Sequence, residues 1–177
     1  MSGMFSHPSP SADVPEVRPE LRASVTIPAS MDHAWAGLTQ HLHLWWPADE
    51  LSRWGEDSFF DLEDNALVET SARDDENVWG EVTDSSPGEW LQLSWRHAGS
   101  ASTTAVRIEM AAGGGSRAGA TTTEAAGEGA GGAGGPRVTL TLIHGGWTAG
   151  DPKDVYDFYR RFWPDALSRY RRFMGGS

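Results

Sequence analysis

Residues 151–173, DPKDVYDFYRRFWPDALSRYRRF, decide the fold of this 177-residue chain. Apolar side chains recur there at the three- and four-residue spacing of one buried helix face. They are Val155, Phe158, Tyr159, Phe162, Trp163, Ala166, Leu167, Tyr170 and Phe173. Asp151 is predicted to cap this helix, with Pro152 in its first turn. Because the ring of Pro164 clashes with the carbonyl of Arg160, we expect a kink or break near Phe162.

The segments before this helix alternate between apolar and polar side chains. Residues 138–144, VTLTLIH, show the period-two pattern of a half-buried strand. Similar patterns predict strands at 21–27, 77–83, 89–97 and 103–110, and a hairpin formed by 58–62 and 66–71. Between the first two strands, Ser30 is predicted to cap a helix that ends near Gln40 or His41. Residues 44–47, LWWP, then form a short second helix or a hydrophobic turn.

The order of these elements indicates one architecture. An antiparallel sheet with one apolar face needs another element laid across that face. Only residues 151–173 are long and apolar enough to do so. The sequence therefore predicts an α+β fold, in which a curved antiparallel sheet wraps around a long C-terminal helix, with a short helix pair after the first strand.

Two segments are too poor in large apolar residues to pack into this core. Residues 1–19, with prolines among serines, are predicted to be a disordered tail. Residues 112–136 are predicted to be a flexible loop rich in glycine and alanine, inserted between the last two strands. Residues 20–174 then form a single domain. There is no cysteine, so neither a disulfide nor a thiolate metal site can stabilise it.

Charge restricts the classes of partner. The net charge is −11, and residues 49–89 carry fourteen acids against Arg53 and Arg73. Such a surface repels phosphate backbones and anionic lipid, so we expect neither nucleic-acid binding nor membrane insertion. The acids either keep the chain in solution or dock a basic partner. Without an apolar run of about 18 residues or a secretory signal, we expect a cytoplasmic location.

Five short motifs occur in an order that resembles the SRPBCC superfamily, also called START-like or birch-allergen-like. They are VTIPAS at 25–30 with AW at 34–35, LWWP at 44–47, WGEV at 79–82 with LQLSW at 91–95, VTLTLIHGGW at 138–147, and WPDAL at 163–167. Within the superfamily they are most similar to homologues of the activator of heat-shock-protein-90 ATPase. The resemblance implies a helix-grip fold over residues 20–173. It also implies either a hydrophobic-ligand cavity between sheet and helix or a chaperone-regulating role in the stress response.

Aromatic residues supply most of the predicted ligand contacts. The candidate ligand-binding residues are Trp46, Phe59, Trp79, Trp95, His97, His144, Trp147, Tyr159 and Trp163. Aromatic walls with a few polar groups suit an apolar ligand. The alternative is that the tryptophans, nine in the chain, simply fill the space between sheet and helix.

Three of the polar side chains could take part in chemistry. His97 and His144 lie on the inward registers of their strands, where each could act as an acid or base or could only hydrogen-bond backbone or water. Glu81 shares a face with Trp79 in regular alternation, so burial would raise its pKa if that face pointed inward. The opposite face, with Val78, Gly80 and Val82, is equally apolar, and we prefer the orientation that leaves Glu81 in solvent.

Other site types have little support in the sequence. His33, His41 and His43 with Asp49 or Glu50 lack the spacing of a metal site, so no metal or cofactor is predicted. The glycine-rich loop lacks the GK[ST] ending of a phosphate loop, and no nucleophile motif is present.

Three functions remain open. The first is binding of a small hydrophobic molecule without catalysis. The second is an interaction module that regulates a chaperone ATPase or another protein. The third is a cyclase, dehydratase or hydrolase that uses His144, His97 or Glu81. No catalytic residue is assigned, and the sequence does not indicate the oligomeric state.

Overall fold

The computed structural model describes residues 17–97, 100, 102–113 and 134–177. Most of the predicted tail and of the predicted glycine-rich loop lies outside these residues. The elements in chain order are β1 (Leu21–Ile27), α1 (Met31–Thr39), the 3-10 helix η1 (Leu42–Leu44), β2 (Phe59–Glu63), β3 (Ala66–Thr70), β4 (Glu76–Ser86), β5 (Trp90–Trp95), β6 (Thr104–Ala112), β7 (Val138–Gly145) and α2 (Lys153–Phe173). Every predicted strand and helix is present, with ends shifted by up to three residues.

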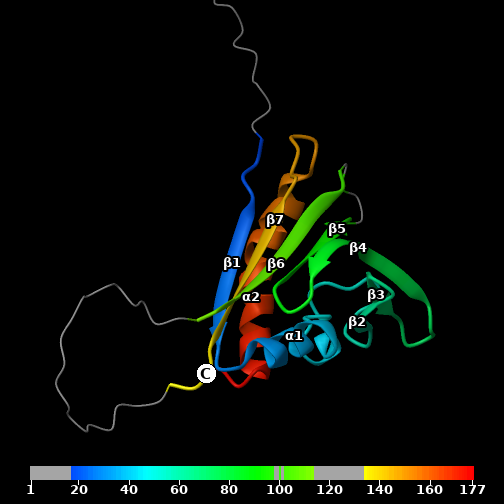
Figure 1. The fold of residues 1–177 in the computed structure, drawn as a ribbon. Coiled ribbons are helices and arrows are strands. Elements are labelled where there is room, and N and C mark those ends of the chain that lie inside the picture. The colour runs from blue at the N-terminus through cyan, green and yellow to red at the C-terminus, as the bar shows by residue number, and fades with distance from the viewer. Residues whose placement is uncertain (1–16, 98–99, 101, 114–133) are drawn as a thin grey trace, which may run out of the picture.

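The seven strands form one antiparallel sheet in the order β1-β7-β6-β5-β4-β3-β2. The sheet curls around α2, and α1 lies at one end of that helix (Figure 1). This arrangement confirms the predicted α+β fold with a curved sheet around the C-terminal helix. None of the described helices is long and apolar enough to cross a membrane.

The core lies between the concave face of the sheet and α2. Strands β5, β6 and β7 bury every second side chain, as the alternation predicted. The buried residues of α2 are Tyr159, Phe162, Trp163, Ala166, Leu167 and Tyr170. Burial of each large apolar side chain contributes about 1.5–3 kcal/mol, so this interface dominates the stability of the fold.

Helix α1 is fixed at both ends by hydrogen bonds. The Ser30 hydroxyl accepts from the His33 backbone N–H, which confirms the predicted N-cap. Near its C-terminus, the Gly37 carbonyl accepts from the indole N–H of Trp45 at 2.9 Å. The Tyr170 hydroxyl donates to the Ala34 carbonyl at 2.7 Å, so α1 is held against the end of α2.

Two details of α2 differ from the prediction. Asp151 does not cap the helix; Pro152 occupies that position, and the Asp151 carboxylate accepts from the Thr148 N–H at 2.7 Å and from the Ser102 hydroxyl. The helix is also continuous across Pro164, so the expected break is wrong. Arg160 and Pro164 both lie on the exposed face, where water can bond the carbonyl that the proline leaves without a donor.

A β-bulge in β4 explains the placement of Trp79 and Glu81. Leu67 pairs with Gly80 and Val68 with Val78, so Trp79 is an extra residue between the two pairs. As a result Trp79 and Gly80 are both buried and Glu81 is exposed, as preferred from the sequence. Val78 is exposed as well, which regular alternation did not predict.

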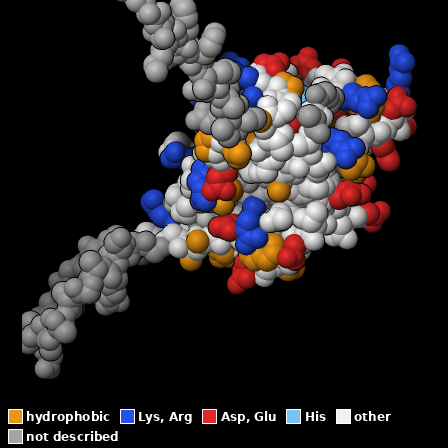
Figure 2. Space-filling view, turned by 90° about the horizontal axis from the view of Figure 1, so that it is seen from above, with side chains coloured by type: hydrophobic (Ala, Val, Ile, Leu, Met, Phe, Trp, Pro, Cys, Tyr) orange, Lys and Arg blue, Asp and Glu red, His pale blue; other side chains and the backbone are white. Residues whose placement is uncertain are grey.

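The charged residues are distributed over the outside of the domain. In the view from above, acidic and basic side chains are interspersed around the rim, and apolar side chains occur in small separate groups (Figure 2). This face therefore shows no broad basic surface of the kind that binds nucleic acid.

Candidate functional site

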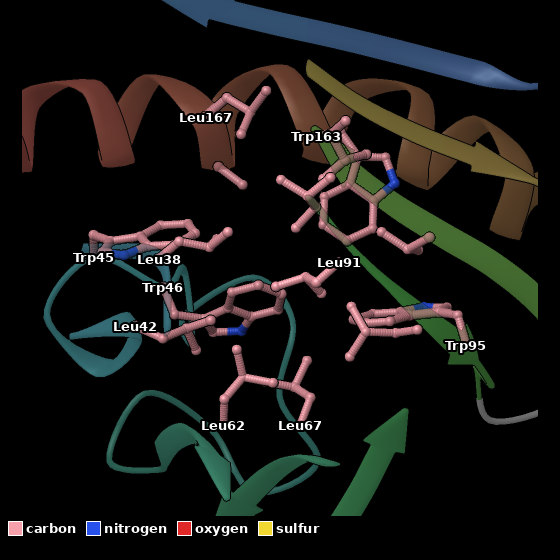
Figure 3. Close-up of a pocket in the computed structure, with 15 residues that line it drawn as sticks. Leu38, Leu42, Trp45, Trp46, Leu62, Leu67, Leu91, Trp95, Trp163 and Leu167 are labelled. Carbon is pink, nitrogen blue, oxygen red and sulfur yellow. The ribbon is translucent and has the colours of Figure 1, made fainter. Parts of the chain in front are cut away.

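Between the sheet and α2 lies an inner cavity with entirely apolar walls. Its lining residues are Leu38, Leu42, Trp45, Trp46, Leu62, Leu67, Leu91, Leu93, Trp95, Val106, Ile108, Leu142, Trp163, Ala166 and Leu167. Trp46 lies near the middle of this group, below Leu167 and Trp163 of α2 (Figure 3). The volume is only about 30 Å³, which is space for water and not for an organic ligand. Aromatic and aliphatic side chains therefore fill most of the interior.

Trp46 lines this cavity with its ring and carries a buried polar atom, the indole nitrogen. Its ring packs against Phe60 at 5.3 Å between centroids and against Trp95 and Trp163 at 6.3 Å each. Its indole nitrogen is buried and has no hydrogen-bond partner among the described residues. A buried donor without a partner costs about 1–3 kcal/mol.

His144 belongs to a series of hydrogen bonds that lies entirely inside the core. The indole N–H of Trp163 donates to His144 Nδ1 at 2.9 Å, and His144 Nε2 lies 2.7 Å from the Thr104 hydroxyl. Because Nδ1 accepts, Nε2 carries the proton and donates to Thr104, whose hydroxyl donates to the Trp95 carbonyl. Burial lowers the pKa of His144 to about 3. This neutral imidazole has no nitrogen available to a bound molecule.

His97 belongs to a second chain that reaches the surface. The buried Tyr159 hydroxyl accepts from the Trp95 indole N–H at 2.9 Å and lies 2.7 Å from His97 Nδ1. Burial raises the pKa of Tyr159, so its hydroxyl stays protonated and donates to His97 Nδ1. His97 Nε2 then carries the imidazole proton. Burial also lowers the pKa of His97, against the opposing effect of the Asp154 carboxylate.

His97 lines a much larger hollow on the surface, which we call the outer groove. Its lining residues are Glu50, Leu51, Ser52, Arg53, Asn77, Val78, Trp79, Arg96, His97, Ser100, Asp154, Val155 and Phe158. The volume is about 880 Å³, and polar and apolar groups share the walls. The groove is formed by the loop after η1, strand β4 near the bulge, the segment that follows β5, and the first turns of α2.

Glu69 accepts hydrogen bonds from three residues that line the outer groove. This fully buried carboxylate accepts from the Trp79 indole N–H at 2.7 Å, from the Arg53 backbone N–H at 2.9 Å and from the Ser52 hydroxyl. Burial alone would raise the pKa of Glu69, but these hydrogen bonds outweigh it and hold the pKa below the usual value. The sequence reasoning missed Glu69, although alternation places it on the same face as Leu67.

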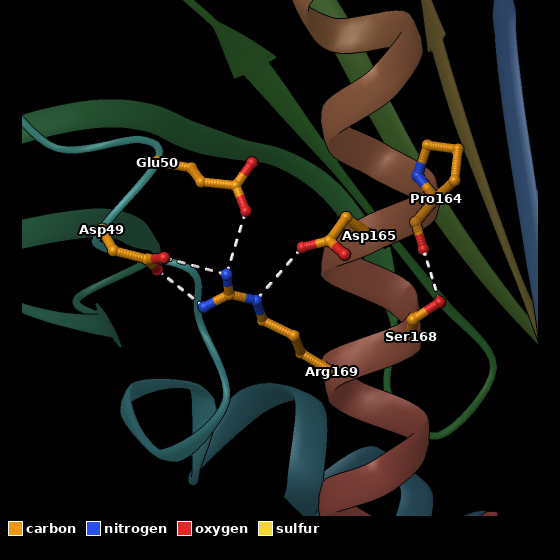
Figure 4. Close-up of polar contacts among 6 residues, drawn as sticks. All are labelled: Asp49, Glu50, Pro164, Asp165, Ser168 and Arg169. Carbon is orange, nitrogen blue, oxygen red and sulfur yellow. Dashed lines mark hydrogen bonds and ion pairs between the residues drawn. The ribbon is translucent and has the colours of Figure 1, made fainter.

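Arg169 connects the loop after η1, which carries Asp49 and Glu50, to α2. Its guanidinium donates to both Asp49 carboxylate oxygens at 2.6 and 2.9 Å, to Glu50 at 2.9 Å and to Asp165 at 3.1 Å (Figure 4). The hydrogen bond from Arg169 lowers the pKa of Asp49. The pKa of Glu50 is raised, first by burial and then by the neighbouring Asp165. One cation thus holds three carboxylates at the edge of the groove.

The nine predicted ligand-binding residues do not come together in one site. Trp46, Trp95 and Trp163 line the inner cavity, and Trp79 and His97 line the outer groove. Tyr159, His144 and Trp147 are buried behind these walls and line neither hollow.

Phe59 lines neither the inner cavity nor the outer groove. Its side chain is 44% exposed, whereas the next residue, Phe60, is buried. The Phe59 ring stacks on His43 at 4.6 Å on the outside of the domain. Phe59 is therefore not part of the site that we propose.

No metal site is evident in the part of the chain that the structure describes. Nowhere in it do three His, Asp or Glu side chains gather in a way that could hold an ion.

No known protein-family model matches the chain, and neither does any curated protein. Solved structures do match it. DynU16, a putative protein in the dynemicin biosynthetic locus, has a TM-score of 0.51 at 19% identity; the match covers 88% of this chain and 47% of DynU16, so the chain spans about half of that protein.

Two further matches cover nearly the whole of both partners. An anthrahydroquino-gamma-pyrone synthase, Txn09, complexed with SUM, has a TM-score of 0.53 at 16% identity, over 88% of this chain and 97% of Txn09. The Aha1 dimer from Colwellia psychrerythraea has a TM-score of 0.52 at 13% identity, over 89% of this chain and 96% of that protein. At these identities the likeness concerns the fold. Together with the seven-stranded curled sheet and its long C-terminal helix, these matches show that the chain has a helix-grip fold.

Proposed function

We propose that this domain binds a small, largely apolar molecule, and that the molecule lies in the outer groove. His97 is the observation that carries the proposal. Its Nδ1 is held by the buried Tyr159 hydroxyl, while its ring lines the groove, so a fixed imidazole N–H is presented to a bound molecule. Sites for small molecules combine apolar walls with a few such fixed polar groups.

The relative size of the two hollows supports this location. The inner cavity of about 30 Å³ is too small for an organic molecule, whereas the outer groove offers about 880 Å³. Trp79, Val155 and Phe158 supply apolar surface on its walls. The proposal therefore moves the ligand from the interior, where the sequence reasoning expected it, to the surface beside the N-terminal half of α2.

A neutral aromatic probe tests the proposal directly. N-phenyl-1-naphthylamine fluoresces strongly only in apolar surroundings, and we expect the wild-type domain to bind it with a saturable signal. Val155→Trp fills the groove with an indole and should weaken binding about tenfold or more, since about 1.4 kcal/mol of lost contact has that effect. Arg161→Trp, on the exposed face of the same helix, is the matched control and should bind as the wild type does.

Three results would overturn the proposal. They are no saturable binding to the wild type, unchanged binding to the Val155→Trp variant, and equal losses in both variants. Circular dichroism of each variant establishes that it is folded.

Acid–base catalysis on the bound molecule is a second candidate function. The observation that favours it is the hydrogen-bonded pair of Tyr159 and His97 beside the groove, with Asp154 near enough to affect the pKa of His97. Proton transfer by His97 needs a reacting group within about 3 Å of Nε2. For any substrate found, His97→Gln should abolish turnover and retain binding; unchanged turnover would remove this candidate.

A further inference from the structure

We propose that the outer groove selects anionic ligands, namely aromatic molecules that carry a carboxylate or a similar oxyanion, through Arg53 and Arg96. This inference rests on the proposed function, because it names the ligand class of the same groove. Both guanidinium groups belong to residues that line the groove.

Neither arginine is neutralised by an acidic side chain of the described residues. Within the described residues, neither Arg53 nor Arg96 forms an ion pair. Arg53 donates to the Asn77 side-chain oxygen at 3.1 Å, and Arg96 donates to the Thr103 hydroxyl at 3.2 Å. Both partners are neutral. In a chain of net charge −11, these two arginines are cations beside one hollow that pair with no acidic side chain among the described residues.

Two carboxylates, those of Glu50 and Asp154, line the same groove. Glu50 is paired with Arg169 at 2.9 Å. Asp154 also lines the groove, and its carboxylate has no cationic partner among the described residues. His97, whose pKa is lowered by burial, adds a neutral N–H donor. The walls thus hold two guanidinium groups and one carboxylate that form no ion pair within the described residues.

The walls combine groups that recognise an anion with groups that bind an aromatic ring. A guanidinium group binds a carboxylate or sulfonate through two parallel N–H donors, a geometry that a neutral ligand does not use. Trp79, Phe158 and Val155 supply the apolar surface for a ring system next to that charge. The groove therefore fits a molecule with an aromatic body and one anionic end.

A pair of probes separates this inference from the proposed function. The compound 8-anilinonaphthalene-1-sulfonate has the ring system of N-phenyl-1-naphthylamine with a sulfonate added. We expect the wild type to bind the sulfonate more tightly than the neutral probe. Because both arginines are exposed, each of Arg53→Gln and Arg96→Gln should weaken sulfonate binding by about threefold to tenfold and leave the neutral probe within twofold.

Arg172→Gln, which removes an exposed arginine of the last turn of α2, is the control and should change neither affinity. Raising the salt concentration should weaken the sulfonate and not the neutral probe. If the two arginine variants weaken both probes equally, or if the wild type shows no preference for the sulfonate, the inference is overturned while groove binding stands. If neither probe binds the wild type, the proposed function fails with it.

Discussion

His144 has both ring nitrogens hydrogen-bonded inside the core, and its pKa is lowered to about 3. In the unfolded chain a histidine titrates near 6.5. Between these two pH values the unfolded state binds the proton and the folded state does not, so stability rises with pH across that window. His144 therefore makes the domain less stable as the pH falls below about 6.5, by up to about 1.4 kcal/mol per pH unit.

Denaturation in urea at several pH values between about 4 and 7 measures this effect. The His144→Gln variant should be less stable at neutral pH and should lose this part of the pH slope, while His33→Gln, at an exposed position of α1, keeps the wild-type slope. If the variant does not fold, NMR of the wild-type imidazole gives the answer. A His144 ring that becomes protonated near pH 6 in the folded protein contradicts the prediction.

Trp45 and Trp46 are adjacent in sequence but differ in their hydrogen bonds. The Trp45 indole N–H donates to the Gly37 carbonyl, and the buried Trp46 N–H has no partner in the described structure. Replacement by Phe removes a similar volume from each. We expect Trp45→Phe to lower the free energy of unfolding by about 1–2 kcal/mol more than Trp46→Phe. Urea denaturation of both variants checks this, and equal losses would count against it.

Single residues show where the sequence reasoning succeeded and where it did not. Alternation alone placed Trp95 and His144 inside, because strands β5 and β7 are regular. It did not identify the role of Glu69, since most of the hydrogen bonds that compensate its burial come from a loop fifteen or more residues away in sequence, and another comes from Trp79 at the bulge. Phe59 and Phe60 are equally apolar in sequence, and only the register of β2 decides between them.

At the scale of elements, the bulge in β4 depends on Gly80. A Cβ added at Gly80 would lie 2.2 Å from the carbonyl oxygen of Ser94 on β5, so no side chain fits without moving the strands apart. We expect Gly80→Ala to lower the free energy of unfolding by about 1–3 kcal/mol. Gly135→Ala is the control, because a Cβ there has no neighbour within 4 Å. Thermal denaturation compares the two, and a neutral Gly80→Ala would contradict the prediction.

The bulge and Pro164 illustrate why element boundaries were easier to predict than element geometry. Periodicity identifies strands and helices from neighbours in sequence. A bulge depends on the partner strand, and the tolerance of Pro164 depends on which side of α2 faces solvent. The bulge and the tolerance of Pro164 are both set by packing. Regular alternation puts Trp79 and Glu81 on the same side of the sheet, so the sequence alone could not predict that they lie on opposite sides.

For the whole molecule, the Arg169 cluster connects α2 to the loop that walls the outer groove. Arg169→Gln leaves Asp49, Glu50 and Asp165 facing one another without a cation. We expect amide hydrogen exchange at residues 49–54 to become faster while the core strands change little. Lowering the pH, or adding Asp165→Asn, should reverse part of the effect because it removes negative charge. Arg161→Gln is the control, and equal exchange in both variants would refute the proposed connection.

The outer groove itself could not have been predicted from the sequence. The loop at 50–53, strand β4, the segment after β5 and the start of α2 form its walls, and these lie up to about a hundred residues apart in the chain. The fold could be predicted because a sheet and one apolar helix have few ways to bury their faces. The site depends on the gaps that remain after that packing, and these are decided by individual side chains such as Trp46 in the interior.

The crowded indole rings also give the domain an optical signature. Trp95 lies 6.1 Å from Trp79, 6.3 Å from Trp46 and 5.4 Å from Trp163 between ring centroids. At such separations the electronic transitions of neighbouring indoles couple, and excitation energy is transferred from ring to ring before emission. The ultraviolet circular dichroism and the emission spectrum of the unlabelled protein therefore report the relative orientation of these rings. A molecule that binds against Trp79 will change both spectra, so binding to the outer groove can be followed without a label.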